Sequence, residues 1–270
     1  MKPGIVPLRP LGVGEILDGS ITAVRRAPGL FGPAALLSVA SALLSFVVQA
    51  QNIGLAADPA DNNSAAVLLS GILLTAISGL ATVVLSALAA VTVREGIQGR
   101  PVTIAAAWAE VRGKIGRLLL IALVATIAWL VGLIALIVPG VYLYVAWHFA
   151  VVVAVIEGGD VRTALRRSRK VVTNSWWRTF GVLLLVGIVA GIISAIITVP
   201  FQVFAGGVGL FTGTHVLSTG ELAITEIGAV IAGVLIRPFE AAAVALIYID
   251  LRMRNEGLDV ALRRAATSPS

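Results

Sequence analysis

The sequence predicts an all-α, polytopic helical membrane protein, with six transmembrane helices in three hairpins and interfacial amphipathic helices between them. Of its 270 residues, 58% are hydrophobic and 13% are charged, whereas charged residues make up about 25% of an ordinary soluble domain. The mean hydropathy is +0.99. Apolar runs of about 18 or more residues recur, and each is long enough to cross a hydrocarbon core of about 30 Å. We therefore expect residues 1–270 to form a single integral membrane domain.

The predicted spans are separated by short segments that are polar, basic or rich in glycine. They cover residues 30–50, 65–93, 118–138, 141–156, 179–200 and 221–251. The first span follows Arg25 and Arg26 and has no small-residue cleavage site, so we expect it to remain in the mature protein. The letters VPG at 138–140 predict a tight turn between the third and fourth spans. The small and polar residues 265–270 predict a frayed tail.

Basic residues occur in alternate segments between the spans. Nineteen of the 20 Lys and Arg residues lie before the first span or after the second, fourth and sixth, and Arg237 is the exception. The positive-inside rule therefore predicts that both termini lie in the cytoplasm. These charges also attract anionic lipid headgroups, by about 1 kcal/mol per basic group near the surface. Because the charge is divided among short juxtamembrane segments, nucleic acid is not an expected partner.

A Glu-Gly pair follows each even-numbered span. The pairs are Glu95-Gly96, Glu157-Gly158 and Glu256-Gly257. Glycine suits the left-handed position that ends a helix. A residue suited to cap the next helix then follows, namely Thr103, Asp160 or Asp259. The pattern predicts three repeats of an interfacial helix followed by two spans, although convergent loop chemistry is the alternative.

Apolar residues at helical spacing predict that these interfacial helices are amphipathic, with the apolar side in the acyl boundary. The predicted apolar stripes are Val13, Leu17, Ser20, Ile21 and Val24; Ile104, Trp108, Val111 and Ile115; and Val161, Leu165 and Val172. A fourth such helix is predicted from Leu258. In the third helix, the candidates for binding lipid headgroups are Arg162, Arg166, Arg169 and Lys170.

Two charges lie deep in the last predicted span. Arg237 is roughly 21 Å from Leu251 at about 1.5 Å per residue, near the middle of the bilayer, where an arginine costs about 2.5–3.5 kcal/mol on insertion scales. Glu240 lies three residues further on, on the same helix face. One interpretation is an internal ion pair. The other is a charged lining for a polar cavity, which His148 and Glu226 could join as further ligand or pathway candidates.

Four stretches together resemble a known family. They are RPLGVGEILDGSITAVRRAPGLFG, VPGVYLYVAWHFAVVVAVIEG, ALRRSRKVVTNSWWRTFG and PFEAAAVALIYIDLRMRNEGLDVAL. They resemble an actinobacterial group of uncharacterised multispan proteins, which is similar to the membrane domain attached to some glycerophosphodiester phosphodiesterases. The resemblance implies this fold and a bacterial inner membrane. It does not imply phosphodiesterase activity, because the hydrolase part of those fusions is a separate soluble barrel.

Motifs for catalysis are missing from the sequence. It has no cysteine and no H-E-x-x-H, G-x-S-x-G or Walker pattern, so we expect neither an enzyme, nor a metal site, nor a cofactor. The leading prediction is a non-enzymatic scaffold or accessory subunit that acts on lipids, on a partner protein or as a homo-oligomer. The alternative is a small solute or lipid transporter or channel that uses Arg237 and Glu240. A membrane enzyme of lipid metabolism is a third possibility.

Overall fold

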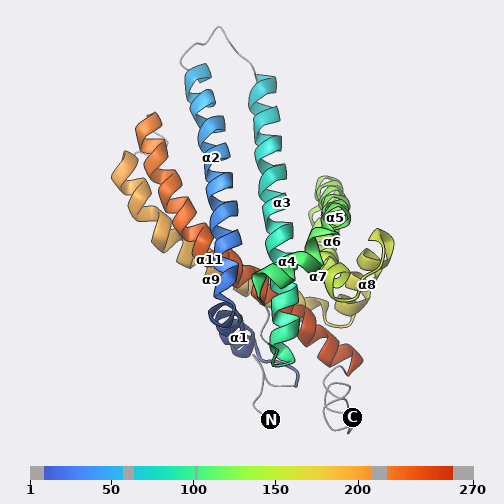
Figure 1. The fold of residues 1–270 in the computed structure, drawn as a ribbon. Coiled ribbons are helices and arrows are strands. Elements are labelled where there is room, and N and C mark those ends of the chain that lie inside the picture. Colours follow the sequence, from blue (N-terminus) through green and yellow to red (C-terminus); the bar gives the residue numbers. More distant parts are fainter. Residues whose placement is uncertain (1–8, 57–63, 101–102, 208–217, 258–270) are drawn as a thin grey trace. The chain divides into compact units, whose positions relative to one another are not determined.

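The computed structural model describes residues 9–56, 64–100, 103–207 and 218–257, and every element in them is a helix (Figure 1). The elements are α1 (Val13–Arg26), the 3-10 helix η1 (Pro28–Leu30), α2 (Phe31–Ala56), α3 (Ser64–Ile97), α4 (Ile104–Arg112), α5 (Ile115–Ala135), α6 (Ile137–Trp147), α7 (Ala150–Ile156), α8 (Val161–Thr173), α9 (Trp176–Gly206) and α11 (Thr219–Glu256). The all-α prediction is confirmed for these residues. Helices suit a bilayer because they satisfy their backbone hydrogen bonds internally.

Five stretches of the described residues are long and apolar enough to cross a membrane. They are Pro28–Gln51, Ile115–Ala135, Ile137–Ile156, Trp176–Gly206 and Thr219–Glu256. They coincide with the first, third, fourth, fifth and sixth predicted spans. The second predicted span, 65–93, is helical as part of α3, but some of its side chains lie outside the described residues. Its crossing of the membrane, and the total of six spans, remain predictions.

The turn between α5 and α6 lies at Leu136, and not at 138–140 as predicted. Leu136 is extended, with φ −164° and ψ 144°, and α6 already begins at Ile137. Pro139 therefore lies in the first turn of α6, where a helix needs no backbone N–H donor. Gly140 packs so closely on α5 that a Cβ on it would lie 2.7 Å from the Cα of Leu133. The fourth span is consequently longer than predicted.

The described chain forms two compact units. Unit 1 comprises Met1–Leu30, Val83–Gly187 and Pro238–Ser270, and unit 2 comprises Phe31–Thr82 and Ile188–Arg237. Helices α3, α9 and α11 each contribute residues to both units. The single integral domain expected from the sequence remains a prediction.

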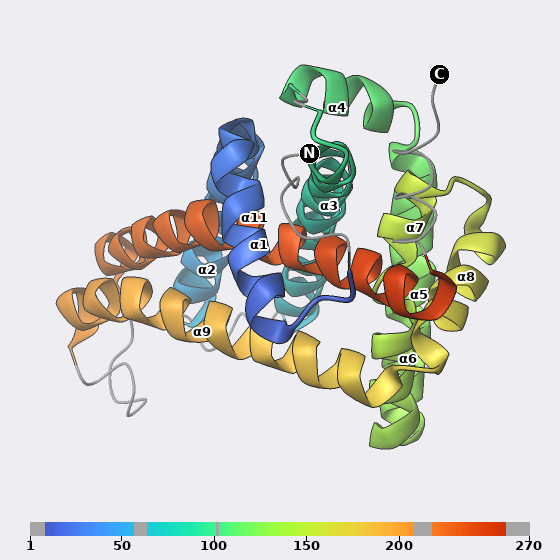
Figure 2. The same ribbon diagram turned by 90° about the horizontal axis from the view of Figure 1, so that it is seen from below.

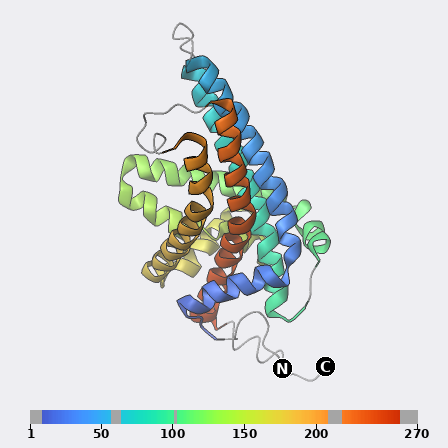
Figure 3. The ribbon, with the colours of Figure 1, turned by 90° about the vertical axis from the view of Figure 1, so that its left-hand side faces the viewer.

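Small residues line the packed faces of both units. In unit 1, helices α5 to α8 pack together (Figure 2), and α11 contributes the buried residues Ala241, Ala242, Ala243 and Ala245. In unit 2, α11 lies beside α2 and α9 (Figure 3). A Cβ on Gly228 would lie 2.9 Å from the ring of Phe201. Small side chains let membrane helices approach closely, which strengthens their van der Waals contact.

The apolar stripes predicted for α1 and α4 are partly buried on protein and partly exposed. In α1 the buried residues are Ile16, Gly19, Ser20, Ala23 and Val24, and in α4 they are Ala107 and Val111. The predicted stripe residues Val13, Ile21 and Trp108 are 36%, 43% and 43% exposed. Ile115, predicted for the second stripe, belongs to α5. Ser20, Val24 and Val111 of the predicted stripes therefore pack on protein. That the exposed stripe residues face the acyl boundary remains a prediction.

The predicted helix ends are confirmed in most repeats. Gly158 and Gly257 have φ of +80° and +63°, as expected for glycines that end helices. After α3 the glycine with a positive φ is Gly99, at +72°, because Gly96 still lies inside α3. Thr103 and Asp160 cap α4 and α8 by accepting hydrogen bonds from the backbone N–H groups of Ala106 and Thr163. Asp259, the helix predicted from Leu258 and the tail 265–270 lie outside the described residues.

Candidate functional site

Helix α8 has one face packed on protein and one face of exposed cations. Its buried residues are Ala164, Ser168, Val171 and Val172, and this face packs on α6 and α7. The Ser168 hydroxyl donates a 2.7 Å hydrogen bond to the carbonyl of Ala146. Within the predicted apolar stripe, Val172 is buried whereas Val161 and Leu165 are half-buried. The apolar face of α8 therefore lies on protein, and not in the acyl boundary as predicted.

The four exposed cations of α8 are the predicted headgroup ligands. Arg162, Arg166, Arg169 and Lys170 all project outward, and no described residue pairs with them. We call these four residues the basic face. Asp160 begins the helix, and hydrogen bonds from Thr163 hold the pKa of its carboxyl below the ordinary value. Trp176 and Trp177 follow α8 at the start of the spanning helix α9, and aromatic residues of this kind gather at membrane interfaces.

The fifth cation of this helix, Arg167, turns inward and fixes α8 to the end of α11. Its guanidinium donates to both carboxylate oxygens of Glu157, at 2.6 and 3.0 Å. It also donates two hydrogen bonds to the carboxylate of Glu256, one of which is 2.6 Å long. Burial raises the pKa of Glu157, but the hydrogen bonds from Arg167 and Tyr248 outweigh it and the pKa lies below its ordinary value. This ion cluster holds the basic face in one orientation.

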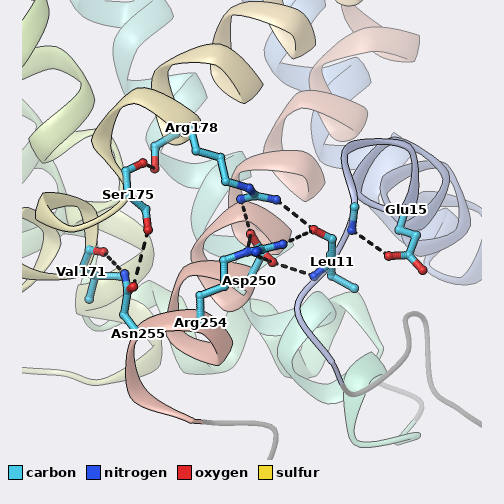
Figure 4. Close-up of polar contacts among 10 residues, drawn as sticks. Leu11, Glu15, Val171, Ser175, Arg178, Asp250, Arg254 and Asn255 are labelled. Carbon is cyan, nitrogen blue, oxygen red and sulfur yellow. Dashed lines mark hydrogen bonds and ion pairs between the residues drawn. The ribbon is translucent and has the colours of Figure 1, made fainter.

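A second cluster in unit 1 fixes the N-terminal segment (Figure 4). The side chain of Asp250 is fully buried, and it accepts a 2.7 Å hydrogen bond from the backbone N–H of Leu11. Arg254 donates to the same carboxylate at 2.9 and 3.1 Å, and Arg178 donates to it as well. Both guanidiniums also donate to the Leu11 carbonyl, at 2.6 and 2.8 Å. We call Leu11, Arg178, Asp250 and Arg254 the Asp250 clamp.

The end of α11 is tied to α8 and α9 beside this clamp. The Asn255 side-chain amide donates a 2.7 Å hydrogen bond to the Val171 carbonyl. The Ser175 hydroxyl lies 3.5 Å from the amide oxygen of Asn255 (Figure 4). Three segments that are distant in the sequence therefore meet at one end of α11.

In unit 2, the predicted pathway residue Glu226 is held by α2. Its Oε1 accepts hydrogen bonds from the Ser45 hydroxyl at 2.7 Å and from the Gln49 amide at 3.1 Å. The carboxylate also lines an otherwise apolar groove of about 360 Å³ between α2 and α11. The groove is lined by Val39, Ala42, Leu43, Phe46, Ala223, Glu226, Ile227, Val230 and Ile231. The volume lies within the range of ligand pockets, about 300–1,000 Å³.

Arg237, the deepest predicted candidate, is also in unit 2. Its Nη1 is buried and has no hydrogen-bond partner among the described residues, and the same holds for the Oγ of Ser38 on α2. Arg237 and Glu226 are about 16 Å apart along α11, from 11 residues at about 1.5 Å each.

The other two predicted candidates belong to unit 1. His148 lies between α6 and α7, and its ring centroid is 4.9 Å from that of Tyr144 and 5.5 Å from that of Phe149. Glu240 follows Arg237 on α11 and interacts electrostatically with Tyr144. The structure thus places two candidates in each unit. Among the described residues, no group of three or more His, Asp or Glu side chains is positioned to hold a metal ion.

Sequence reasoning missed the two ion clusters of unit 1. The spacing of Asp250 and Arg254, four residues apart, is a recognisable signal for an ion pair on a helix. Glu157 and Glu256 were noticed only as parts of Glu-Gly pairs, and nothing in their spacing indicates that Arg167 joins them. The role of Leu11 has no sequence signal, because its backbone makes the contacts.

Comparison with known proteins gives one match. A family model described as a domain of unknown function (DUF7847) matches residues 11–251. No curated protein and no solved structure matches the chain. The match shows no link to the membrane domains of glycerophosphodiester phosphodiesterases. The matched region begins at Leu11 and ends beside Asp250, so the Asp250 clamp joins the two ends of that region.

Proposed function

Since this chain belongs to the DUF7847 family, which has no assigned function, we propose a role from its own surfaces: a non-enzymatic scaffold or accessory subunit that binds anionic lipid headgroups through the basic face of α8. The observation that carries the proposal is the fixed orientation of this face. Four cations are exposed on one side of α8, while the opposite side is buried and Arg167 fixes the helix by its ion pairs.

The location of α8 suits this role. The helix is followed at once by the membrane-spanning α9, whose first turn carries Trp177, 79% exposed. On this proposal the cations lie near the depth at which phosphate groups of lipids are found. Each basic group near such a surface contributes about 1 kcal/mol of attraction to anionic lipids. Because the side chains are held on a folded helix, they can act together on a cluster of headgroups.

We place this face on the cytoplasmic side of a bacterial inner membrane, as the distribution of basic residues predicts. Such a surface would serve a partner protein that processes anionic lipids, because it would gather their headgroups beside that partner. A homo-oligomer would serve the same purpose by enlarging the basic surface.

The test is native mass spectrometry of protein extracted from nanodiscs that contain equal amounts of phosphatidylglycerol and phosphatidylcholine. We expect the wild type to retain phosphatidylglycerol selectively. A variant with Gln at all four positions of the basic face should lose most of that selectivity, since about 1 kcal/mol per group is removed. A matched variant with Lys at 162, 166 and 169 keeps the charge and should retain it. Equal selectivity in the Gln variant would refute the proposal.

A transporter or channel is the second candidate, and the unpartnered Nη1 of Arg237 favours it. A buried cationic donor without a partner is costly, and such groups in membrane segments commonly mark pathways. Flux of a radiolabelled anion into proteoliposomes, lost in Arg237→Gln but retained in the Gln variant of the basic face, would favour transport over the scaffold.

A further inference from the structure

Helices α2 and α11 share a polar seam within unit 2. On α2, Ser38, Ala42, Ser45 and Gln49 follow one another at intervals of four, three and four residues, which places them on one helix face. On α11, Glu226, Val230, Gly233 and Arg237 have the same spacing. The Ser45–Glu226 hydrogen bond and the close approach of Ser38 to Gly233 place these two faces against each other in antiparallel register.

The polar groups at the two ends of the seam differ in whether they have hydrogen-bond partners. At one end, Glu226 accepts hydrogen bonds from Ser45 and Gln49. At the other end, Ser38 is only 3% exposed, yet neither its Oγ nor the buried Nη1 of Arg237 has a partner among the described residues. Buried polar groups are nearly always hydrogen-bonded, and those that are not indicate a missing water, ion or ligand.

Gly233 lets these two groups lie close together, because a residue without a side chain allows α2 and α11 to approach closely here. A Cβ at position 233 would lie 2.6 Å from the Ser38 Oγ and 3.4 Å from the Arg237 Nε. The Ser38 Oγ and the Arg237 Nε therefore lie within about 6 Å of each other, so one oxygen ligand beside Gly233 would reach both the hydroxyl and the guanidinium. The hydroxyl and the guanidinium are both hydrogen-bond donors. The chemistry that completes this arrangement is an anionic oxygen, since charge-assisted hydrogen bonds to a guanidinium are the strong ones.

The apolar groove described above lies along the same two helices. It is lined by Val39, the residue next to Ser38, and extends along the same pair of helices to Glu226. Two of its lining residues, Leu43 and Ile227, are 62% and 53% exposed, so the groove is open at its surface. An apolar chain fits its lining, whereas the carboxylate of Glu226 repels an anionic group at the far end. The lining residues Val39 and Val230 each lie within one helical turn of Ser38 or Gly233, so an anionic head at that end of the groove is nearest to Arg237 and furthest from Glu226.

We propose that Ser38, Gly233 and Arg237 bind the carboxylate of a fatty-acid-like amphiphile whose chain lies in the groove between α2 and α11. This site goes beyond the headgroup-binding basic face, and it involves no residue of α8. Binding supplies the two missing hydrogen-bond partners, which reduces the cost of burying the Nη1 of Arg237 inside the membrane.

The test uses native mass spectrometry of the full chain in a nonionic detergent, titrated separately with palmitate, hexadecanol and acetate. Palmitate has both the chain and the charge, hexadecanol has only the chain, and acetate has only the charge. We expect palmitate to bind most tightly. Arg237→Gln should weaken palmitate binding about tenfold or more, because a hydrogen bond to a charged group is lost, and should bring it to the level of hexadecanol.

Two further variants keep the test decisive if Arg237→Gln fails to fold. Gly233→Ala should weaken palmitate binding, because the new methyl group occupies the space beside Ser38. Its matched control is Gly191→Ala, also in unit 2, where an added Cβ meets nothing within 4 Å. Arg237→Lys keeps the charge and should retain binding in part.

Three results would overturn the proposal. The first is equal affinity for palmitate and hexadecanol, which would leave a water molecule as the partner of Arg237. The second is acetate binding as tightly as palmitate, which would assign the site to a free anion. The third is wild-type palmitate affinity in Gly233→Ala. The Gln variant of the basic face should bind palmitate normally, so failure of this site and failure of the headgroup proposal are separable.

Discussion

Replacing Asp250 with Asn should release the N-terminal segment and destabilise unit 1. The substitution keeps the size of the side chain but removes its charge, and the buried carboxylate now accepts from Leu11, Arg178 and Arg254. Asn has a single oxygen acceptor where Asp has two. At least one guanidinium then loses its hydrogen bond to the side chain at position 250. The hydrogen bonds that remain to this side chain no longer involve a carboxylate.

The expected loss is about 2–4 kcal/mol of unfolding free energy. Removing one partner of a buried ion pair costs about 3–5 kcal/mol. The side chains of Arg178 and Arg254, however, are 29% and 31% exposed, so water solvates their charges in part. Their bonds to the Leu11 carbonyl also persist. For these two reasons we expect a loss about 1 kcal/mol smaller than that range.

Two measurements check this expectation. Thermal unfolding in detergent, followed by tryptophan fluorescence, reports the stability. Hydrogen exchange with mass spectrometry on a peptide that contains Leu11 reports the clamp directly, because the amide of that residue donates to Asp250. The matched control is Asp18→Asn, which removes an exposed carboxylate from α1. If Asp250→Asn unfolds like the wild type and leaves exchange at Leu11 unchanged, the clamp does not hold the N-terminal segment.

Two further predictions concern packing and pH. Gly140→Ala should cost about 1–3 kcal/mol by overpacking against Leu133, whereas Gly181→Ala, with nothing within 4 Å, should be neutral or stabilising in the same unfolding assay. The pKa of Glu157 is lowered from 4.5, because hydrogen bonds chiefly from Arg167 outweigh the effect of burial. Its carboxylate therefore stabilises the fold above pH 4.5, and this contribution is lost as the pH falls through the folded-state pKa. Melting temperatures measured on acidification should fall less steeply in Glu157→Gln, and identical slopes would contradict this assignment.

The candidate residues were partly accessible to sequence reasoning. The four cations of the basic face are exposed as their helical spacing predicts. Arg237 stood out because charge is rare inside apolar spans. The proximity of Arg237 to Ser38 could not be predicted, since the two residues lie about 200 positions apart in the chain and serines are common in membrane helices.

The sequence by itself determined that the chain is helical, where most of its spans lie and which residues cap its short helices. These properties depend on local composition, on glycine geometry and on the thickness of a bilayer, and all three act within a few turns of helix. Hydrophobic spacing did not determine which face of α1 or α4 is buried, because a bulky apolar side chain is equally stable against lipid.

Only the tertiary structure decided which helix faces pack on protein. Within the membrane, the choice depends on small residues that let helices approach closely, and on hydrogen bonds between distant segments. The Asp250 clamp, the inward turn of Arg167 and the close approach of Ser38 to Gly233 all arise in this way. Each joins helices that are far apart in the sequence, and so each depends on the packing of the complete fold.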